Sequence, residues 1–508
     1  MESKRSEEES VSALKPDRVA SSFQKKIRNI LANSCLPLVA ITLAGALLRL
    51  YHLGFKALWF DEAMIYWIVK GRTFSEIIPL NAAYNSAPPL FTVLTALVVQ
   101  LSETEFALRF IPWLAGVVSI PVVYFLARQF IGKIPAYVSA GLVALAPTQV
   151  RYSQELREYS LAFLLAALMI LFFTRYLREN KIKDLIPMTV LMVIAVFTQY
   201  GLALLIIALN IIFLIQLFSE KNRVNKKIQR WLIAQLIVAA AVVVVYATAL
   251  RQQFTIGWGA AADSSYLSPY YGSGGFLSLL DFAISRSAGL FDFAYPRPVF
   301  LLLALLGLII AAAKRKHFTP LMLFVLPTAL TLALALAKLY PYGGIRQAIF
   351  LTPMIYILAG LGVNRLLEFD RSGLVIALVL FFPIVNGLYH SSQVVARIGD
   401  ENIRPIVTTL DKSYQPGEMI YVYYGATPAF SYYYRENKSA QVIGTRNRGD
   451  MDRYLAEIEA VLTEGKPTWL VFSHCYADEC QLIPEYISNK YRVDLKEKSP
   501  GTFLYYVH

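Results

Sequence analysis

Long apolar runs separated by short polar connections fill the sequence between residues 36 and 390. An α-helix needs about 20 mostly apolar residues to cross the hydrocarbon core of a bilayer. The pattern therefore predicts a polytopic α-helical membrane protein with about eleven transmembrane helices, the shorter of which extend into flanking polar residues. The predicted spans are residues 36–53, 106–127, 134–150, 159–177, 185–200, 201–218, 231–250, 298–313, 318–338, 346–364 and 373–390.

The composition excludes several other classes of protein. Of the 508 residues, 56% are hydrophobic and 16% are charged, whereas ordinary soluble domains carry roughly a quarter charged residues. A disordered chain, a disulfide-linked scaffold and a soluble multidomain enzyme are thereby excluded. The formal net charge is +13, but the basic residues lie between the apolar runs, as they do in the cytoplasmic loops of membrane proteins. We therefore expect the lipid bilayer as a partner, and no nucleic acid.

The positions of lysine and arginine predict the orientation of the chain in the membrane. Basic residues from Lys4 to Arg28 precede the first span. If the N-terminus is cytoplasmic, every even-numbered connection is cytoplasmic too and each carries basic residues, whereas the opposite connections are longer and poorer in them. This positive-inside pattern predicts a multi-pass protein of the plasma (inner) membrane with a cytoplasmic N-terminus. The basic connections are residues 128–133, 175–183, 221–230, 314–316 and 365–371.

Residues 88–101 are apolar but too few for a straight span. Counting them as a span would also put the basic connections on alternating sides of the membrane. We therefore predict that they form an interfacial or re-entrant helix in the outer leaflet.

The sequence changes character after residue 390. Residues 419–424 (MIYVYY) and 468–472 (TWLVF) are typical of strands, and residues 451–462 have helical spacing of apolar side chains. Cys475 and Cys480 would pair if this part faces an oxidising compartment. The predicted division is a disordered cytoplasmic tail (1–34), a transmembrane catalytic domain (35–390) and a small extracytoplasmic α/β domain (391–508).

Polar residues gather at four places on the predicted outer face. Asp61 and Glu62 interrupt an apolar, aromatic stretch, and residues 151–159 hold many hydrogen-bonding groups. Arg109 and Arg346 lie at the outer ends of two spans. A solvated loop or interfacial anchoring explains each one alone. Together they indicate a site for an anionic headgroup combined with acid–base chemistry, because arginine binds phosphate through two parallel hydrogen bonds.

Five segments, in this order along residues 36–390, resemble the GT-C superfamily of membrane glycosyltransferases. More closely, the chain resembles the bacterial protein-O-mannosyltransferase-like group, which includes the lipid A aminoarabinose transferase. The resemblance implies that Asp61 matches the essential acidic residue of the first loop and that Pro88-Pro89 begin an interfacial helix. It also marks a departure, because the family commonly has His where this chain has Ala87. The segments are LWFDEA (58–63), SAPPL (86–90), FALRFIP (106–112), YSQELREYS (152–160) and RQAIFLTP (346–353).

We predict a glycosyltransferase that moves a hexose or pentose from a polyprenyl-phosphate donor to a hydroxyl group of a lipid, glycan or protein. A single attack by an oxygen nucleophile would invert the anomeric centre, as the resemblance also implies. The alternative is a lipid-linked sugar flippase or transporter, which should line its path with ionisable residues in mid-membrane. The predicted catalytic residues are Asp61, Glu62 and Glu155: Asp61 is the base, and Glu62 or Glu155 orients it. If a metal takes part, Asp61 and Glu155 would hold a divalent cation. The predicted substrate-binding residues are Arg109, Gln154, Arg157, Tyr159 and Arg346.

Overall fold

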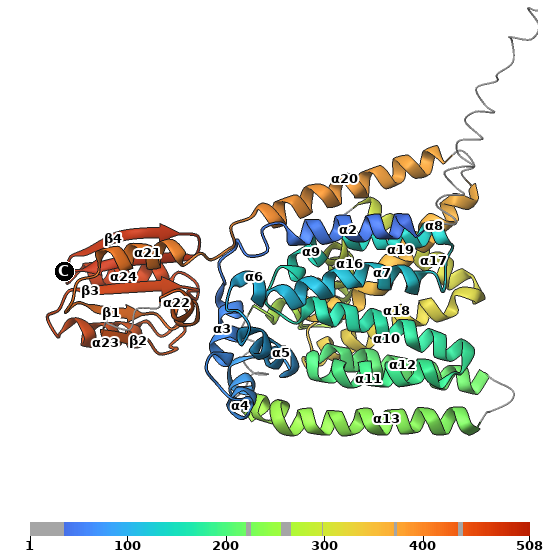
Figure 1. The fold of residues 1–508 in the computed structure, drawn as a ribbon, viewed down its shortest axis with the longest axis horizontal. Helices are drawn as coiled ribbons and strands as arrows, with labels where there is room; N and C mark the ends of the chain where they lie inside the picture. The colour runs from blue at the N-terminus through green and yellow to red at the C-terminus, as the bar shows by residue number, and fades with distance from the viewer. Residues whose placement is uncertain (1–34, 220–224, 256–265, 297, 370–372, 435–439) are drawn as a thin grey trace, which may run out of the picture.

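The computed structural model describes residues 35–219, 225–255, 266–296, 298–369, 373–434 and 440–508. A bundle of long helices carries, at one end, a small domain built on a β-sheet (Figure 1). These are the two structured parts that the sequence pattern predicts. The predicted disordered tail lies outside the described residues.

Each of the predicted spans contains a long helix of the bundle. Within the described residues, seven helices are long and apolar enough to cross a membrane, and an eighth if the bent pair α16 and α17 forms one span. The chain is therefore a multi-pass helical membrane protein. The bundle helices are α2 (Leu36–Leu50), α7 (Phe110–Ala127), α8 (Lys133–Leu145), α10 (Tyr159–Glu179), α11 (Ile182–Thr198), α12 (Gly201–Ser219), α13 (Asn225–Val245), α16 (Phe276–Ala294), α17 (Val299–Ala313), α18 (Phe318–Leu336), α19 (Thr352–Phe369) and α20 (Leu374–Ala396).

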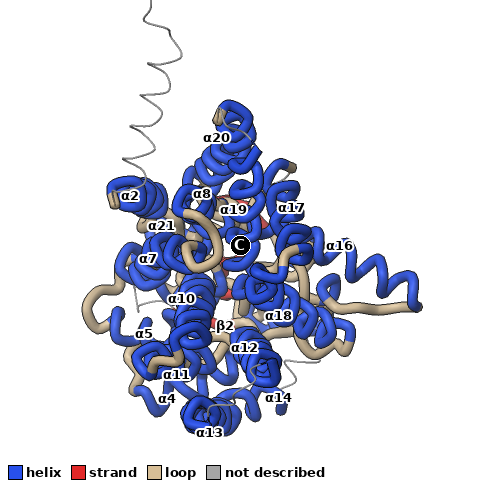
Figure 2. Tube along the Cα trace, turned by 90° about the vertical axis from the view of Figure 1, so that its right-hand side faces the viewer, coloured by secondary structure: helices blue, strands red, loops and turns tan. Residues whose placement is uncertain are grey.

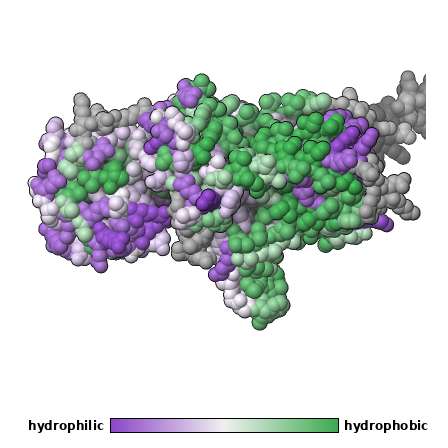
Figure 3. All heavy atoms as spheres, turned by 90° about the horizontal axis from the view of Figure 1, so that it is seen from below, coloured by the Kyte–Doolittle hydropathy of each residue, from purple (hydrophilic) through white to green (hydrophobic). Residues whose placement is uncertain are grey.

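Helix α19 is the most buried helix of the bundle, and it positions the segment that precedes it. It lies near the centre of the end-on view, whereas α13 and α20 lie at the rim (Figure 2). A Cβ atom at Gly307 of α17 would meet the backbone oxygen of Leu358 at 1.8 Å, so only glycine lets these two backbones approach this closely. On the face seen in Figure 3, apolar residues cover most of the bundle, while polar residues cover much of the C-terminal domain.

Short helices cover the end of the bundle that faces the C-terminal domain. Within residues 88–101 the structure has one helix of ten residues, α5, which packs against α3 and α4. The short elements at this end are α3 (Phe60–Val69), α4 (Phe74–Tyr84), α5 (Leu90–Val99), α6 (Glu105–Leu108), α9 (Pro147–Ser153), η1 (Tyr246–Leu250), α14 (Arg251–Thr255), η2 (Ser268–Tyr270) and η4 (Arg346–Leu351). One further short element, η3 (Arg315–His317), lies in the connection between α17 and α18.

The C-terminal domain is a five-stranded mixed sheet of order β2-β1-β3-β5-β4 with helices on both faces. Strand β1 pairs in parallel with β2 and β3, whereas β5 is antiparallel to β3 and β4. The predicted α/β domain is thus confirmed, and Cys475 is disulfide-bonded to Cys480. Its elements are α21 (Arg404–Ser413), β1 (Met419–Val422), α22 (Thr427–Tyr433), β2 (Ala440–Ile443), α23 (Met451–Leu462), β3 (Thr468–Ser473), α24 (Glu479–Ser488), β4 (Val493–Ser499) and β5 (Thr502–Val507).

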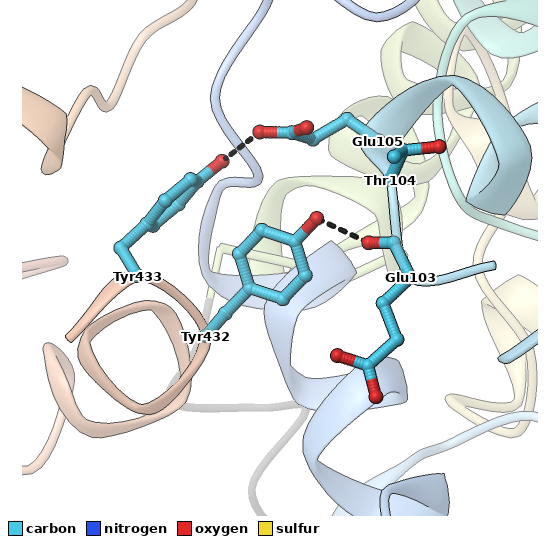
Figure 4. A pocket seen from close by; sticks show the side chains of 5 residues that line it. All are labelled: Glu103, Thr104, Glu105, Tyr432 and Tyr433. Carbon is cyan, nitrogen blue, oxygen red and sulfur yellow. Dashed lines mark hydrogen bonds between the residues drawn. The ribbon is translucent and has the colours of Figure 1, made fainter. Parts of the chain in front are cut away.

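The C-terminal domain docks on the short helices through α22. The hydroxyl group of Tyr433 donates to the Glu105 carboxylate at 3.0 Å, and the Tyr432 ring packs edge-on against Tyr66. The Arg404 guanidinium forms an ion pair with Glu105. A cavity of about 480 Å³ lies at this junction, lined by Glu103, Thr104, Glu105, Tyr432 and Tyr433 (Figure 4).

Candidate active site

Asp61 and Arg346 form the centre of the candidate site. Asp61 lies in the first turn of α3, and Arg346 begins η4, which leads into the central helix α19. Arg346 Nη1 lies 2.8 Å from Asp61 Oδ2, and the two side chains are only 17% and 19% exposed. Two segments far apart in the sequence are therefore joined by a largely buried ion pair.

Aromatic rings surround the guanidinium of Arg346. Its Cζ atom lies 5.5–5.7 Å from the ring centroids of Trp59, Tyr159 and Tyr266. Arg157 lies on the same tyrosine, 5.6 Å from the Tyr159 centroid. Cation–π attraction stabilises both charges where water is scarce. Tyr159 thus holds two arginines beside Asp61.

Several buried polar atoms at this centre have no hydrogen-bond partner among the described residues. Buried polar groups in proteins are normally satisfied, so such a concentration marks a place built for a polar ligand. Arg157 Nε does lie 3.2 Å from Glu158 Oε2, but as an ion pair without hydrogen-bond geometry. The unsatisfied atoms are Asp61 Oδ2, Arg346 Nε, Arg157 Nε, Glu155 Oε1, Glu158 Oε2 and Gln347 Oε1.

The two carboxyl groups of the centre differ in proton affinity. Burial by itself raises the pKa of Asp61, but the charges of Arg346 and Arg157 outweigh it, and the pKa lies below its usual value. Burial raises the pKa of Glu155 to about 7, although Arg151 and Arg346 oppose the shift. Near neutral pH, Asp61 is therefore ionised while Glu155 titrates. Such a separation is typical of sites in which two carboxyl groups have different roles.

Glu62 and Arg109, two further predicted site residues, are bound to each other beneath the centre. Arg109 Nε and Nη2 donate to the Glu62 carboxylate at 2.8 and 2.7 Å. The other Arg109 donors bind the backbone oxygens of Leu53, Lys56 and Ala57. All five N–H donors of Arg109 thus have protein acceptors, and this guanidinium does not face the site with Arg157 and Arg346.

Gln154 also supports the first loop. Its Nε2 donates to the backbone oxygens of Arg49 and Tyr51, and its Oε1 accepts from Lys56. The structure therefore brings together Asp61, Glu155, Arg157, Tyr159 and Arg346, while Glu62, Arg109 and Gln154 form the layer that holds the loop.

Replacing Arg109 by methionine should destabilise the fold. The carboxylate of Glu62 would remain buried without its counter-charge, which costs about 3–5 kcal/mol for a buried pair. Denaturant unfolding in detergent measures this loss. The matched control is Arg453→Met, because Arg453 pairs with Asp450 at the exposed surface, where such a pair contributes about 0–1 kcal/mol. Equal stability of the two variants would contradict the structural role of Arg109.

The donor set at the centre does not fit a metal ion. Asp61 and Glu155 are the residues predicted to hold a cation if a metal takes part, but the Asp61 carboxylate is already paired with Arg346. Within the described part of the chain, no group of three or more His, Cys, Asp or Glu is arranged to hold a metal ion.

Some residues of the site carry no clear signal in the sequence. Asn85 Oδ1 accepts from Arg157 Nη2 at 3.3 Å, and Asn81 links Asn85 to the backbone oxygen of Ala87. Asn85 stands beside the SAPPL segment and could have been suspected from its position. His474 lies in the C-terminal part, outside the resemblance, and nothing near it in the sequence indicates a site.

Comparison with known proteins identifies the fold. The family described as dolichyl-phosphate-mannose-protein mannosyltransferase matches residues 86–247. The structure of ArnT from Cupriavidus metallidurans bound to undecaprenyl phosphate is similar over 93% of this chain and 98% of ArnT, with a TM-score of 0.56 and 13% identity. The chain has the GT-C fold.

Other GT-C structures are similar as well. The archaeal oligosaccharyltransferase AglB from Archaeoglobus fulgidus, in complex with an inhibitory peptide and a dolichol-phosphate, matches 92% of this chain and 74% of its own, with 12% identity and a TM-score of 0.55. The apo form of the Archaeoglobus fulgidus oligosaccharyltransferase matches 86% and 69%, with 11% identity and a TM-score of 0.52. A search of curated protein sequences found no match.

Proposed function

We propose that this chain transfers a sugar from a polyprenyl-phosphate carrier to a hydroxyl group of a lipid, glycan or protein at the outer face of the membrane. The observation that carries the proposal is the pair of buried arginines, Arg157 and Arg346, each with an unsatisfied Nε–H beside an ionised Asp61. The ligands of ArnT and AglB, undecaprenyl phosphate and dolichol-phosphate, support a lipid phosphate as the donor's carrier.

The two arginines suit the phosphate of such a donor. In the reaction, the bond between the anomeric carbon and the phosphate oxygen breaks, and its electron pair stays on the phosphate. Positive groups already in place stabilise the charge that develops there. The aromatic rings around Arg346 hold its guanidinium in one orientation, so little reorganisation is needed when the donor binds.

Asp61 is the proposed general base. The acceptor oxygen attacks the anomeric carbon from the face opposite the phosphate, and its proton passes to the Asp61 carboxylate. When the donor binds, its phosphate competes with Asp61 for the guanidinium of Arg346. The Asp61 carboxylate then regains proton affinity before the acceptor hydroxyl transfers its proton. Glu155, whose Oε1 atom has no partner among the described residues, accepts a hydrogen bond from a second O–H or N–H group of the acceptor.

We assign the site to the outer face of the membrane from the distribution of basic residues. The connections α7–α8, α10–α11 and α17–α18 lie at the end of the bundle away from the C-terminal domain (Figure 1), and they carry basic residues. By the positive-inside rule this end is cytoplasmic. The Asp61 site and the C-terminal domain then share the outer face of the plasma (inner) membrane.

Transfer should depend on pH through Glu155. The groups that act on it are Arg151, Arg346, Glu62 and Asp61. Because the ionised form accepts the hydrogen bond, the rate should rise with pH around a midpoint near 7. Rates measured between pH 5 and 9 check this. In Glu155→Gln this midpoint should disappear, and a rate that falls as pH rises through 7 would contradict the role of the ionised form.

A transfer assay tests the function itself. The purified protein is incubated in detergent with a panel of radiolabelled polyprenyl-phosphate sugars and extracted membrane lipids, glycans and proteins, and label is followed into the acceptor. We expect transfer from one donor class, and none from a variant with Arg157 and Arg346 both replaced by glutamine. No transfer with any donor, together with passage of labelled donor across reconstituted vesicles, would overturn the proposal in favour of a flippase.

A further inference from the structure

The C-terminal domain, which lies outside the family resemblance, reaches the loop that carries Asp61. Glu401 belongs to the connection between α20 and α21, and its Oε2 accepts a hydrogen bond from the backbone N–H of Phe60 at 2.9 Å. Phe60 is the first residue of α3. The first N–H groups of a helix have no partner within it, and a carboxylate there is stabilised by the helix dipole. Glu401 therefore caps the helix on which Asp61 lies.

His474 secures this cap from the end of β3. Its Nδ1 lies 2.6 Å from Glu401 Oε1, so both carboxylate oxygens of Glu401 are used. Its ring stacks on the Phe60 ring, with the centroids 4.1 Å apart and the planes 2° from parallel. The backbone of His474 has a φ of +51°, a left-handed conformation that non-glycine residues adopt at a cost. The Cys475–Cys480 disulfide begins at the next residue.

A third contact holds the same loop. The hydroxyl group of Tyr433 accepts a hydrogen bond from the backbone N–H of Leu58 at 2.9 Å. The N–H groups of Leu58 and Phe60 are thus both bound by residues far along the chain, on either side of Trp59. Trp59 is one of the rings around Arg346. These contacts therefore hold the backbone next to Asp61 and the backbone that carries Trp59, the ring beside Arg346.

We propose that Glu401 and His474 are positioning residues for transfer: through Phe60 they hold α3 so that Asp61 faces Arg346, and they make the C-terminal domain part of the catalytic unit. This inference rests on the proposed function, because the aligned carboxylate is the proposed base. A residue that aligns a base affects the turnover number more than the affinity for donor, since a misplacement of about 1 Å can cost a hundredfold in rate.

The same domain offers a matched control. His508 lies 2.8 Å from Asp494 through its Nε2 atom, in a second histidine–carboxylate pair between β4 and the chain end. That pair is exposed, with side chains 39% and 31% accessible, and Asp494 also binds Lys496. His508→Ala therefore removes an equivalent pair without touching α3.

Steady-state kinetics tests the inference. We expect His474→Ala to lower kcat about tenfold to a hundredfold with the donor KM within about twofold of wild type, and His508→Ala to match wild type. His474→Asn keeps a donor for Glu401 and His474→Phe keeps the ring, so each should restore part of kcat. If His474→Ala has the wild-type kcat, the inference is wrong. If His474→Ala does not fold, a wild-type kcat in both His474→Asn and His474→Phe overturns the inference instead. Absence of transfer by the wild type would instead overturn the proposed function.

Amide hydrogen exchange tests the contact of Glu401 and His474 with α3 independently of the transfer reaction. In the full-length protein, the amides of Leu58 and Phe60 should exchange at least about tenfold faster in Glu401→Ala and His474→Ala than in wild type, because the carboxylate that accepts from Phe60 is lost or displaced and the segment that also carries Leu58 is less firmly held. In His508→Ala they should keep wild-type protection. Unchanged protection in both Glu401→Ala and His474→Ala would overturn the positioning role, whatever the transfer assay shows.

Discussion

Replacing Asp61 by asparagine is expected to lower the turnover number for sugar transfer about a thousandfold. Asparagine has nearly the same shape but no negative charge, so it cannot take the proton of the acceptor hydroxyl. Donor binding should survive, because the variant leaves the arginines in place and frees Arg346 from its ion pair. The donor KM should therefore stay at its wild-type value or fall. Initial rates with radiolabelled donor, measured over a range of donor concentrations, give both constants.

Asp184→Asn is the control for this experiment. Asp184 is also buried and pairs with an arginine, Arg175, at 3.1 Å, but it lies at the start of α11, at the other end of the bundle. The control variant should transfer at the wild-type rate. A donor KM that rises in Asp61→Asn while turnover at saturating donor is retained would assign Asp61 to donor binding and remove it as the base.

Replacing Arg346 by glutamine should raise the donor KM by about tenfold to a hundredfold, because a hydrogen bond to a charged group contributes about 1.5–3 kcal/mol. Turnover should also fall, since the leaving phosphate loses a positive neighbour. Arg157→Gln should act in the same direction, and the double variant should be worse than either. Arg346→Lys keeps the charge but lacks the forked donor geometry and the Nε–H, so it should recover only part of the affinity.

Arg346→Gln should also change the acid side of the pH profile. The charge of Arg346 holds the pKa of Asp61 below its usual value, against the opposing effect of burial. Without that charge, the pKa of Asp61 rises, and so does the pKa of Glu155, which Arg346 also lowers. The acid limb, which Glu155 places near pH 7 in the wild type, should therefore move to a higher pH. Arg175→Gln, which removes the cation beside Asp184, should leave both the donor KM and the acid limb unchanged.

Much of the fold was predictable because its signals are local. Apolar runs long enough for a bilayer appear directly in the sequence, and each predicted span contains a helix of the bundle. The strands at 419–424 and 468–472 and the helix at 451–462 were predictable for the same reason. The number of crossings is harder to derive, because broken and bent helices such as α16 and α17 have the same composition as continuous ones.

The candidate site was predictable only in part. Asp61 and Arg346 were predicted as site residues because they are charged residues beside apolar segments, and in the structure they form one ion pair. Arg109 was predicted for the same reason, but all its N–H donors have protein acceptors, so its guanidinium does not face the site. A sequence shows that an arginine lies near the membrane surface, but it does not show whether a carboxylate or a backbone oxygen already binds the guanidinium.

By itself, the sequence determined that this chain is a multi-pass membrane protein with a C-terminal α/β domain, and that the polar residues beside its spans gather at a few places. These properties follow from patterns within some twenty neighbouring residues, the length over which a helix or strand is specified. Only the tertiary structure decided which arginine faces the site, which carboxyl group titrates near pH 7, and that Glu401 and His474 touch the Asp61 loop. Those properties depend on contacts between residues hundreds of positions apart, and on the burial that such contacts create.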